Sequence, residues 1–232
     1  MYKSDRELFE LVERSLYTAV IGDVMDSMGF LNQFLSPQIR PLGDVSILTG
    51  RAMTVLEADI HQAAAMAAGR GIDPEEVGQP FGRMLDALDG LKEGEIYLCA
   101  GASPNYALWG ELMSTRAKAC GSRGAIMDGY HRDTKGILEI GFPVFSYGNY
   151  AQDQAPRGKV IDFRCPLRIG NVQVESGDLI VADIDGVVIV PRAIEEEVIR
   201  LAYEKATGEK TVQKAIEGGL TAREAWDKYG IL

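Results

Sequence analysis

The chain has 232 residues, of which 46% are hydrophobic and 25% charged, and its formal net charge is −10 at pH 7. This length suits one compact domain with a large core, which needs neither disulfides nor a structural metal to fold. The acidic balance argues against direct contact with nucleic acid or with an anionic membrane. The three cysteines are widely spaced and form no CxxC pair, which indicates reduced thiols and argues against a zinc site.

The first residues carry acids and bases early and lack the apolar stretch of a secretory signal. No apolar run approaches the roughly 18 residues that a membrane-spanning helix needs. We therefore expect a cytoplasmic protein.

The first two thirds of the chain alternate helical and extended patterns. A helical period runs over 5–28, where Thr18 is predicted to restart the helix as an N-cap and Gly29 to end it. Further helices are predicted at 59–68, 81–91, 110–120 and 134–140. Strands are predicted at 50–57, 95–100, 125–128 and 143–147. Loops are predicted at 38–44 and 69–79, and a break at 101–105.

After residue 160 the period drops to two, with Pro and Gly punctuation. This pattern predicts strands at 160–164, 171–174, 179–183 and 186–190. A charged amphipathic helix follows at 195–214, and a last short helix at 221–232. We interpret the whole chain, 1–232, as a single α/β domain with a core at 1–194 and a C-terminal helical arm at 195–232.

Arg132 and Asp133 form the first candidate site. A predicted strand ends at Asp128, Gly129 permits a tight turn, and α/β folds usually place ligands beyond the carboxyl end of a strand. Arginine offers a planar fork for a carboxylate or enolate oxygen, and aspartate a hard oxygen for Mg²⁺. The spacing alone is somewhat more typical of a surface turn in which Asp133 caps the next helix.

The second candidate is the start of the predicted helix at 110–120. Free backbone N–H groups at a helix start bind anions, and Gly110 allows close approach. Glu111 brings a carboxylate to the same place. The alternative is a plain strand–helix connection in which Glu111 stabilises the helix dipole.

Asp183 and Asp185 suggest a metal pair, but the alternation around them and the Asp185–Gly186 dipeptide favour a hairpin turn. The two histidines, His61 and His131, lack the spacing of metal ligands, and His131 is interpreted as lining the turn at Arg132. The lysines lie mostly in polar stretches, which argues against Schiff-base chemistry.

Together these segments resemble the RraA-like family, which includes 4-hydroxy-4-methyl-2-oxoglutarate aldolases. The resemblance begins with Thr18–Asp23 and Gly50–Val55, and is strongest in Trp109–Leu112, Asp128–Asp133 and Gly177–Pro191. It implies an α/β/α sandwich similar to the phosphohistidine swivelling domain. It also implies trimers or trimer-based hexamers, with active sites between subunits.

The resemblance implies a lyase that cleaves a 4-hydroxy-2-oxo acid to pyruvate through a metal-stabilised enolate, with oxaloacetate decarboxylation as a side activity. Asp133 would be the direct ligand of Mg²⁺ or Mn²⁺, and Arg132 would hold the keto or enolate oxygen. Backbone N–H groups of Gly110, Glu111, Leu112 and Met113 would hold the pyruvate carboxylate.

Glu111 would also bind a metal water and help to move protons. The resemblance further implies a glutamate from a neighbouring subunit's arm, for which we select Glu209, with Glu204 as the alternative. A regulator that binds and inhibits a ribonuclease is the competing function, and Glu111 favours the enzyme. Methyl transfer is a third possibility, which no glycine-rich cofactor loop supports.

The segment 59–83 is longer and more polar than the family pattern. It contains His61, Arg70 and Arg83. We expect this segment to border the active site and to set specificity for the distal part of the substrate, with one of its arginines within reach of Arg132 and Asp133. The alternative is a solvated surface excursion.

Overall fold

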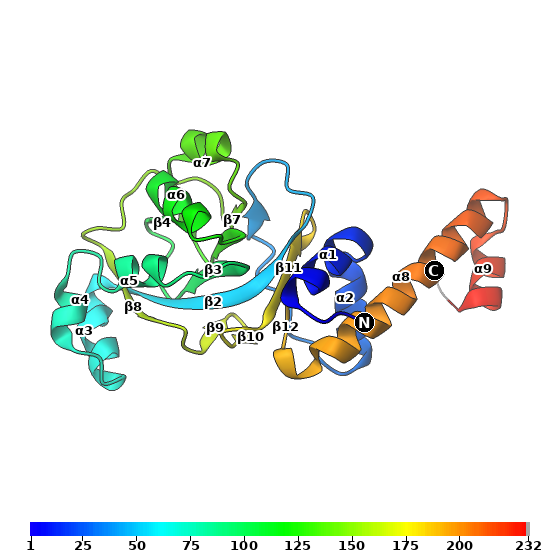
Figure 1. The fold of residues 1–232 in the computed structure, drawn as a ribbon, viewed down its shortest axis with the longest axis horizontal. Helices are drawn as coiled ribbons and strands as arrows, with labels where there is room; N and C mark the ends of the chain where they lie inside the picture. Colours follow the sequence, from blue (N-terminus) through cyan, green and yellow to red (C-terminus); the bar gives the residue numbers. More distant parts are fainter. Residues whose placement is uncertain (231–232) are drawn as a thin grey trace.

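The structure is a computed structural model, and it describes residues 1–230. Its centre is a mixed eight-stranded sheet in the order β1-β7-β5-β3-β2-β11-β12, with β8 beside β2. The long strand β2 (Leu48–Asp59) crosses the molecule, and helices lie around the sheet and beyond its far end (Figure 1). Within residues 1–230, no helix is long and apolar enough to cross a membrane.

Strand β2 organises the sheet because both of its edges are paired. One edge runs parallel to β3 (Glu95–Ala100), whereas β11 (Leu179–Asp183) and β8 (Gly158–Phe163) share the other edge in antiparallel pairing. Nearly every residue of β2 is buried. The strand predicted at 50–57 is therefore confirmed and extends further in both directions.

The remaining strands complete the sheet on each side. On the β3 side, β5 (Gly124–Met127) and β7 (Val144–Ser146) continue the parallel order, and the two-residue strand β1 (Arg40–Pro41) closes the edge. On the β11 side, β12 (Gly186–Val190) forms the edge.

Side chains on the two faces of the sheet belong to different hydrophobic cores. On one face, Tyr97 and Met127 pack under α5 (Met84–Asp89), α6 (Glu111–Ala119) and α7 (Thr134–Ile140). The opposite face packs against the hairpin β9 (Leu167–Ile169) and β10 (Val172–Val174), and against α3 (Ile60–Gly69). The predicted α/β class is confirmed. The similarity to a swivelling domain stays a prediction.

A third hydrophobic core contains helices from both ends of the chain. It lies between the β11–β12 end of the sheet and the helices α1 (Asp5–Ser15), α2 (Thr18–Ser27) and α8 (Glu195–Glu217). Helix α8 continues away from the sheet, and α9 (Ala222–Tyr229) turns back beside its far end (Figure 1). The predicted helical arm is confirmed, although the last helix was predicted to reach 232 and residues 231–232 lie outside the described residues.

The hairpin interpretation of the two acids is confirmed, because Asp183 pairs with Gly186 across β11 and β12. The buried Asp183 carboxylate accepts hydrogen bonds from the backbone N–H and the hydroxyl of Thr18, at 2.8 and 2.7 Å, and from the N–H of Asp185. Thr18 is therefore not the N-cap that the sequence predicted. It is the first residue of α2, and a carboxylate 165 residues away caps that helix.

Several short elements were not predicted. The loop expected at 69–79 contains α4 (Pro74–Gly78), which Asp73 caps by accepting from the N–H of Glu75. The strand β9 was missed, as was a separate two-stranded sheet of β4 (Ala107–Trp109) and β6 (Tyr130–His131). This small sheet proves important for the site.

Candidate functional site

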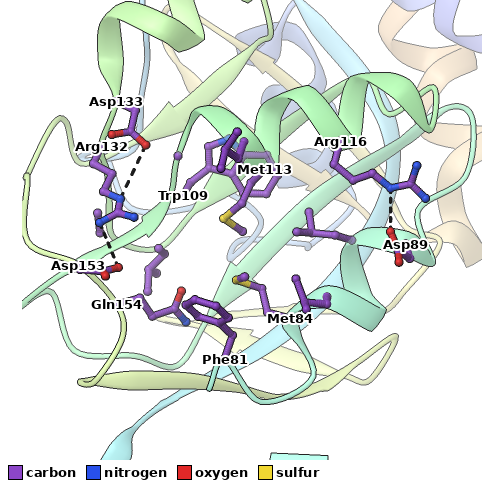
Figure 2. Close-up of a pocket in the computed structure, with 16 residues that line it drawn as sticks. Phe81, Met84, Asp89, Trp109, Met113, Arg116, Arg132, Asp133, Asp153 and Gln154 are labelled. Carbon is purple, nitrogen blue, oxygen red and sulfur yellow. Dashed lines mark hydrogen bonds and ion pairs between the residues drawn. The ribbon is translucent and has the colours of Figure 1, made fainter. Parts of the chain in front are cut away.

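A cavity of about 410 Å³ lies where α5, β4 and the start of α6 meet the turn after β6. Figure 2 shows Arg132, Asp133, Asp153 and Gln154 at one end of it and the Arg116–Asp89 pair at the other, with apolar side chains between them. The apolar lining consists of Phe81, Met84, Leu85, Leu88, Ala107, Leu108, Trp109, Leu112 and Met113.

The small sheet brings the two sequence candidates together. Strands β4 and β6 run parallel, and the N–H of Arg132 donates to the carbonyl oxygen of Trp109 at 2.9 Å. Gly110 and Arg132 thereby become neighbours although 22 residues separate them. Gly110, Leu112 and Met113 from the first predicted cluster and Arg132 and Asp133 from the second line the same cavity.

Asp133 adopts the left-handed conformation, with φ at 57°, in the N-cap position of α7. This conformation is costly for a residue other than glycine and is found mainly where the surrounding structure enforces it. The side chain makes no capping bond to α7. It turns to α6 instead, where it accepts from the N–H of Glu111 at 3.3 Å. The capping alternative for Asp133 is therefore wrong.

Glycine at position 110 leaves room for the Asp133 carboxylate at the start of α6. A Cβ atom at that position would lie 2.6 Å from Oδ2 of Asp133, which is closer than real Cβ contacts. Leu112 and Met113 follow in the first turn of α6, where helix geometry leaves the N–H groups without an intrahelical acceptor. The helix start thus presents donors beside the Asp133 carboxylate.

Arg132 lies between two carboxylates. Its Nη1 is 3.0 Å from Asp153, its Nε is 3.7 Å from Asp133, and all three side chains are partly exposed. Asp153 was not predicted, because it belongs to an irregular segment without a motif. The segment is anchored by the N–H of Ala107, which donates to the carbonyl of Gln152.

Asp133 could hold a divalent cation at the cavity, whereas the Glu111 side chain does not line the cavity. The Glu111 carboxylate lies over α7, where a Cβ atom at Gly136 would be 2.0 Å from it, so only glycine leaves room for the side chain. No group of three His, Cys, Asp or Glu side chains suited to a metal occurs in residues 1–230. One or two carboxylates still fit Mg²⁺, which usually keeps several waters and takes oxygens from its substrate.

The selected arm glutamates are not at this cavity within one chain. Glu209 contacts the Tyr17 hydroxyl and Lys205, whereas Glu204 pairs with Arg200. Both belong to α8, which lies over a different part of the sheet from α6 (Figure 1). The contribution of such a residue from a neighbouring subunit stays a prediction.

The expectation that Arg70 or Arg83 reaches the site is wrong. Both arginines pair with Asp162, at 3.3 and 3.0 Å, and neither lines the cavity. The guanidinium of Arg83 also lies over the ring of Phe163. The segment nevertheless borders the cavity through Phe81, so its contribution there is apolar.

Behind the cavity lies a buried acid that the sequence analysis did not single out. Glu57 is fully buried, and its Oε2 accepts from Nε2 of Gln154 at 2.6 Å, whereas its Oε1 has no partner among the described residues. Burial raises the pKa of Glu57 to about 8. The sequence showed only an acid at the end of the strand predicted at 50–57, with no motif around it.

His131 has a structural role beside Arg132. The ring is buried, and its two nitrogens lie 2.7 Å from the hydroxyl of Ser146 and 3.1 Å from that of Thr134. Burial lowers the pKa of His131, so the neutral ring is favoured. The interpretation that it lines the turn fits these contacts.

The family model described as Aldolase/RraA matches residues 18–189. A Halalkalibacterium halodurans protein named "Putative 4-hydroxy-4-methyl-2-oxoglutarate aldolase" is 28% identical over 92% of this chain and 90% of its own length. An uncharacterized protein structure from Pseudomonas syringae pv. tomato has a TM-score of 0.81 at 26% identity, covering 97% of this chain and 94% of its own.

A solved structure of Streptomyces coelicolor RraAS2, described as an unusual member of the RNase ES inhibitor RraA family, has a TM-score of 0.77. It is 22% identical and covers 92% of this chain and all of its own. At that identity the likeness concerns the fold.

Proposed function

Because the chain belongs to the RraA-like family, we propose that it is a divalent-metal-dependent carbon–carbon lyase that cleaves a 4-hydroxy-2-oxo acid to pyruvate. One observation carries the proposal. Arg132 and Asp133 lie together against the start of α6, at the polar end of a cavity large enough for a small organic acid. The aldolase name of the Halalkalibacterium relative supports the same reaction class.

The reaction breaks the C3–C4 bond of the substrate. The 4-hydroxyl group loses its proton and becomes the carbonyl of the leaving aldehyde or ketone, while the bonding electrons pass to C3 and the keto oxygen as an enolate. Protonation at C3 then yields pyruvate. The protein must therefore stabilise negative charge on one oxygen and move two protons.

Arg132 is suited to hold the developing oxyanion, because its guanidinium already lies at the cavity end and carries a permanent charge. The N–H groups of Leu112 and Met113, in the first turn of α6, are suited to hold the substrate carboxylate. Glu111, which also starts α6, would move protons at the substrate hydroxyl.

Mg²⁺ or Mn²⁺, when bound, would supply a Lewis acid next to the keto oxygen. Asp133 would hold the cation, and Glu111 would contact one of its waters. Glu209 of a neighbouring subunit would complete the site in a trimer or hexamer, with Glu204 as the alternative. Loss of CO₂ from oxaloacetate forms the same enolate, so we propose oxaloacetate decarboxylation as a side activity.

The test couples pyruvate release to lactate dehydrogenase, with 4-hydroxy-4-methyl-2-oxoglutarate and oxaloacetate as substrates. We expect activity that EDTA abolishes and added Mg²⁺ restores, and background rates for Asp133→Ala in all conditions. Activity that survives both EDTA and Asp133→Ala would contradict the proposal. Inactivity of the wild type on every 2-oxo acid would shift the balance to a ribonuclease regulator, which a binding assay would then have to establish.

A further inference from the structure

We propose that the apolar middle of the cavity selects 4-hydroxy-2-oxo acids whose C4 substituent is a hydrocarbon chain or ring, in preference to those with a second carboxylate. This inference rests on the proposed function, because it assumes that the 2-oxo acid end of the substrate lies at Arg132 and Asp133. It assigns the substrate class from the side chains that the rest of the substrate would contact.

The charges around the cavity argue against a second anionic group. Two cations line it, Arg132 and Arg116, and each has a carboxylate beside it. Nε of Arg116 lies 2.7 Å from Oδ1 of Asp89, and Arg132 lies between Asp133 and Asp153. Lining carboxylates therefore outnumber lining cations. Since Asp89 contacts only Nε of Arg116, a second carboxylate could bind the Nη atoms of Arg116, but only at the end of the cavity opposite Arg132 (Figure 2).

The space between the two charged ends is apolar. Trp109, Met113, Met84 and Phe81 lie between the Arg132 end and the Arg116–Asp89 pair (Figure 2). A C4 substituent that leaves the Arg132 end along the cavity meets these side chains first. Phe81 comes from the end of the segment 59–83, so this segment contributes an apolar wall where the sequence suggested an arginine.

The expected gain in kcat/KM from these apolar contacts follows from the free energy of burying a methylene. Burial of one methylene corresponds to about 0.8 kcal/mol, or about fourfold in an equilibrium or rate ratio. Each added methylene should therefore raise kcat/KM about fourfold until the chain fills the cavity. A carboxylate placed among these apolar side chains would lose its hydration without a cation beside it.

The experiment uses a matched series of pyruvate aldols. Ethanal, propanal, butanal and pentanal give 4-hydroxy-2-oxo acids that differ by one methylene each, and glyoxylate gives the dicarboxylate 4-hydroxy-2-oxoglutarate. Cleavage releases pyruvate and the parent aldehyde from every member, so one coupled assay compares them. We expect kcat/KM to rise about fourfold per methylene and the dicarboxylate to be at least tenfold below the pentanal adduct. A flat series, or a preference for the dicarboxylate, would overturn the proposal.

A substitution in the wall gives a second readout. Leu85 on α5 lines the cavity and is 59% exposed, so Leu85→Arg introduces a cation without a buried charge. We expect this variant to flatten the methylene series and to raise kcat/KM for 4-hydroxy-2-oxoglutarate at least threefold. Leu138→Arg is the control, because Leu138 on α7 is 51% exposed and does not line the cavity.

The assembly state is measured alongside by light scattering. If Leu85→Arg dissociates an oligomer and leaves the substrate preference unchanged, the apolar lining around Leu85 is an interface between copies of the chain and the proposal is wrong. Failure of the proposed function looks different, because the wild type would then release pyruvate from no member of the series.

Discussion

Asp133 and Asp183 show how two acids with the same sequence character come to different roles. Asp183 ends the strand β11, Asp133 follows the strand β6, and both were candidates for a metal. Asp183 is buried and accepts three hydrogen bonds from Thr18 and Asp185. Asp133 is exposed, accepts one bond at 3.3 Å, and holds a left-handed backbone conformation.

The number of donors separates the two roles. A carboxylate whose oxygens are all satisfied stabilises the fold and has little capacity left for a ligand, whereas an exposed carboxylate with one long bond retains that capacity. Glu57 is a third case, since it is fully buried with a single donor. Four predictions test this division.

The largest effect is expected at Glu57, in the dependence of stability on pH. The pKa of Glu57 rises from 4.5 to about 8 on folding because burial disfavours the charged form. The contribution of neutral Glu57 to the free energy of unfolding is therefore complete below pH 4.5. It is lost as the pH rises through about 8, where the buried carboxyl group ionises. A shift of this size corresponds to on the order of 5 kcal/mol.

Glu57→Gln should abolish this part of the pH dependence. The free energy of unfolding, measured with urea at pH 5 and pH 8.5, should fall less with pH in the variant than in the wild type. The other titrating groups are shared by both proteins, and Tyr97, Cys99 and Tyr106 near Glu57 stay neutral because their pKa values are raised. Equal slopes in both proteins would show that Glu57 is ionised or solvated in the native state.

The second prediction concerns Arg132, which lies beside Asp133 at the cavity. Arg132→Ala should lower kcat for pyruvate release roughly 10²-fold or more, the scale of one lost oxyanion partner at about 3 kcal/mol. Arg132→Lys should recover only part of this loss, because a point charge lacks the planar fork. Unfolding stability should change little, since the arginine is partly exposed. Full activity in Arg132→Lys would mean that only charge is needed.

The regular strands and helices were the predictable part of the fold. The strands at 95–100, 179–183 and 186–190 and the helix at 134–140 match their predicted bounds, because a strong local pattern sets each and Gly or Pro lies within a few residues of its ends. The resemblance predicted the family, and it grouped Arg132 and Asp133 with Gly110, Leu112 and Met113, which line one cavity in the structure.

Contacts between distant segments were not predictable in the same way. The strands β4 and β6 are three and two residues long, too short for any period to identify, yet they align Gly110 with Arg132. The cap of α2 comes from Asp183 at the other end of the chain. Asp153 and Gln154 join the site through an irregular segment without a motif.

The third prediction tests the structural acid. Asp183→Ala leaves the N–H and hydroxyl of Thr18 and the N–H of Asp185 without their acceptor, in a buried place. The expected loss is about 2–3 kcal/mol of unfolding free energy, of the order of a lost cap plus a buried unsatisfied donor. Pyruvate release per folded molecule should be unchanged under conditions where the variant stays folded. A loss of activity at full stability would contradict the division of roles.

The smallest effect on stability is expected for Asp133→Asn, and this variant is the sharpest test of the comparison. Asparagine retains the shape of the side chain and tolerates the left-handed conformation, so the free energy of unfolding should stay within about 0.5 kcal/mol of the wild type. Its amide lacks the full negative charge that a divalent cation favours, so metal-dependent pyruvate release should fall to background. The matched variant is Asp183→Asn. Its amide N–H groups would face the N–H and hydroxyl donors of Thr18, which would lower the free energy of unfolding by about 1–2 kcal/mol without affecting turnover of the folded protein. If both asparagine variants lost stability equally, the number of donors would not distinguish the two acids.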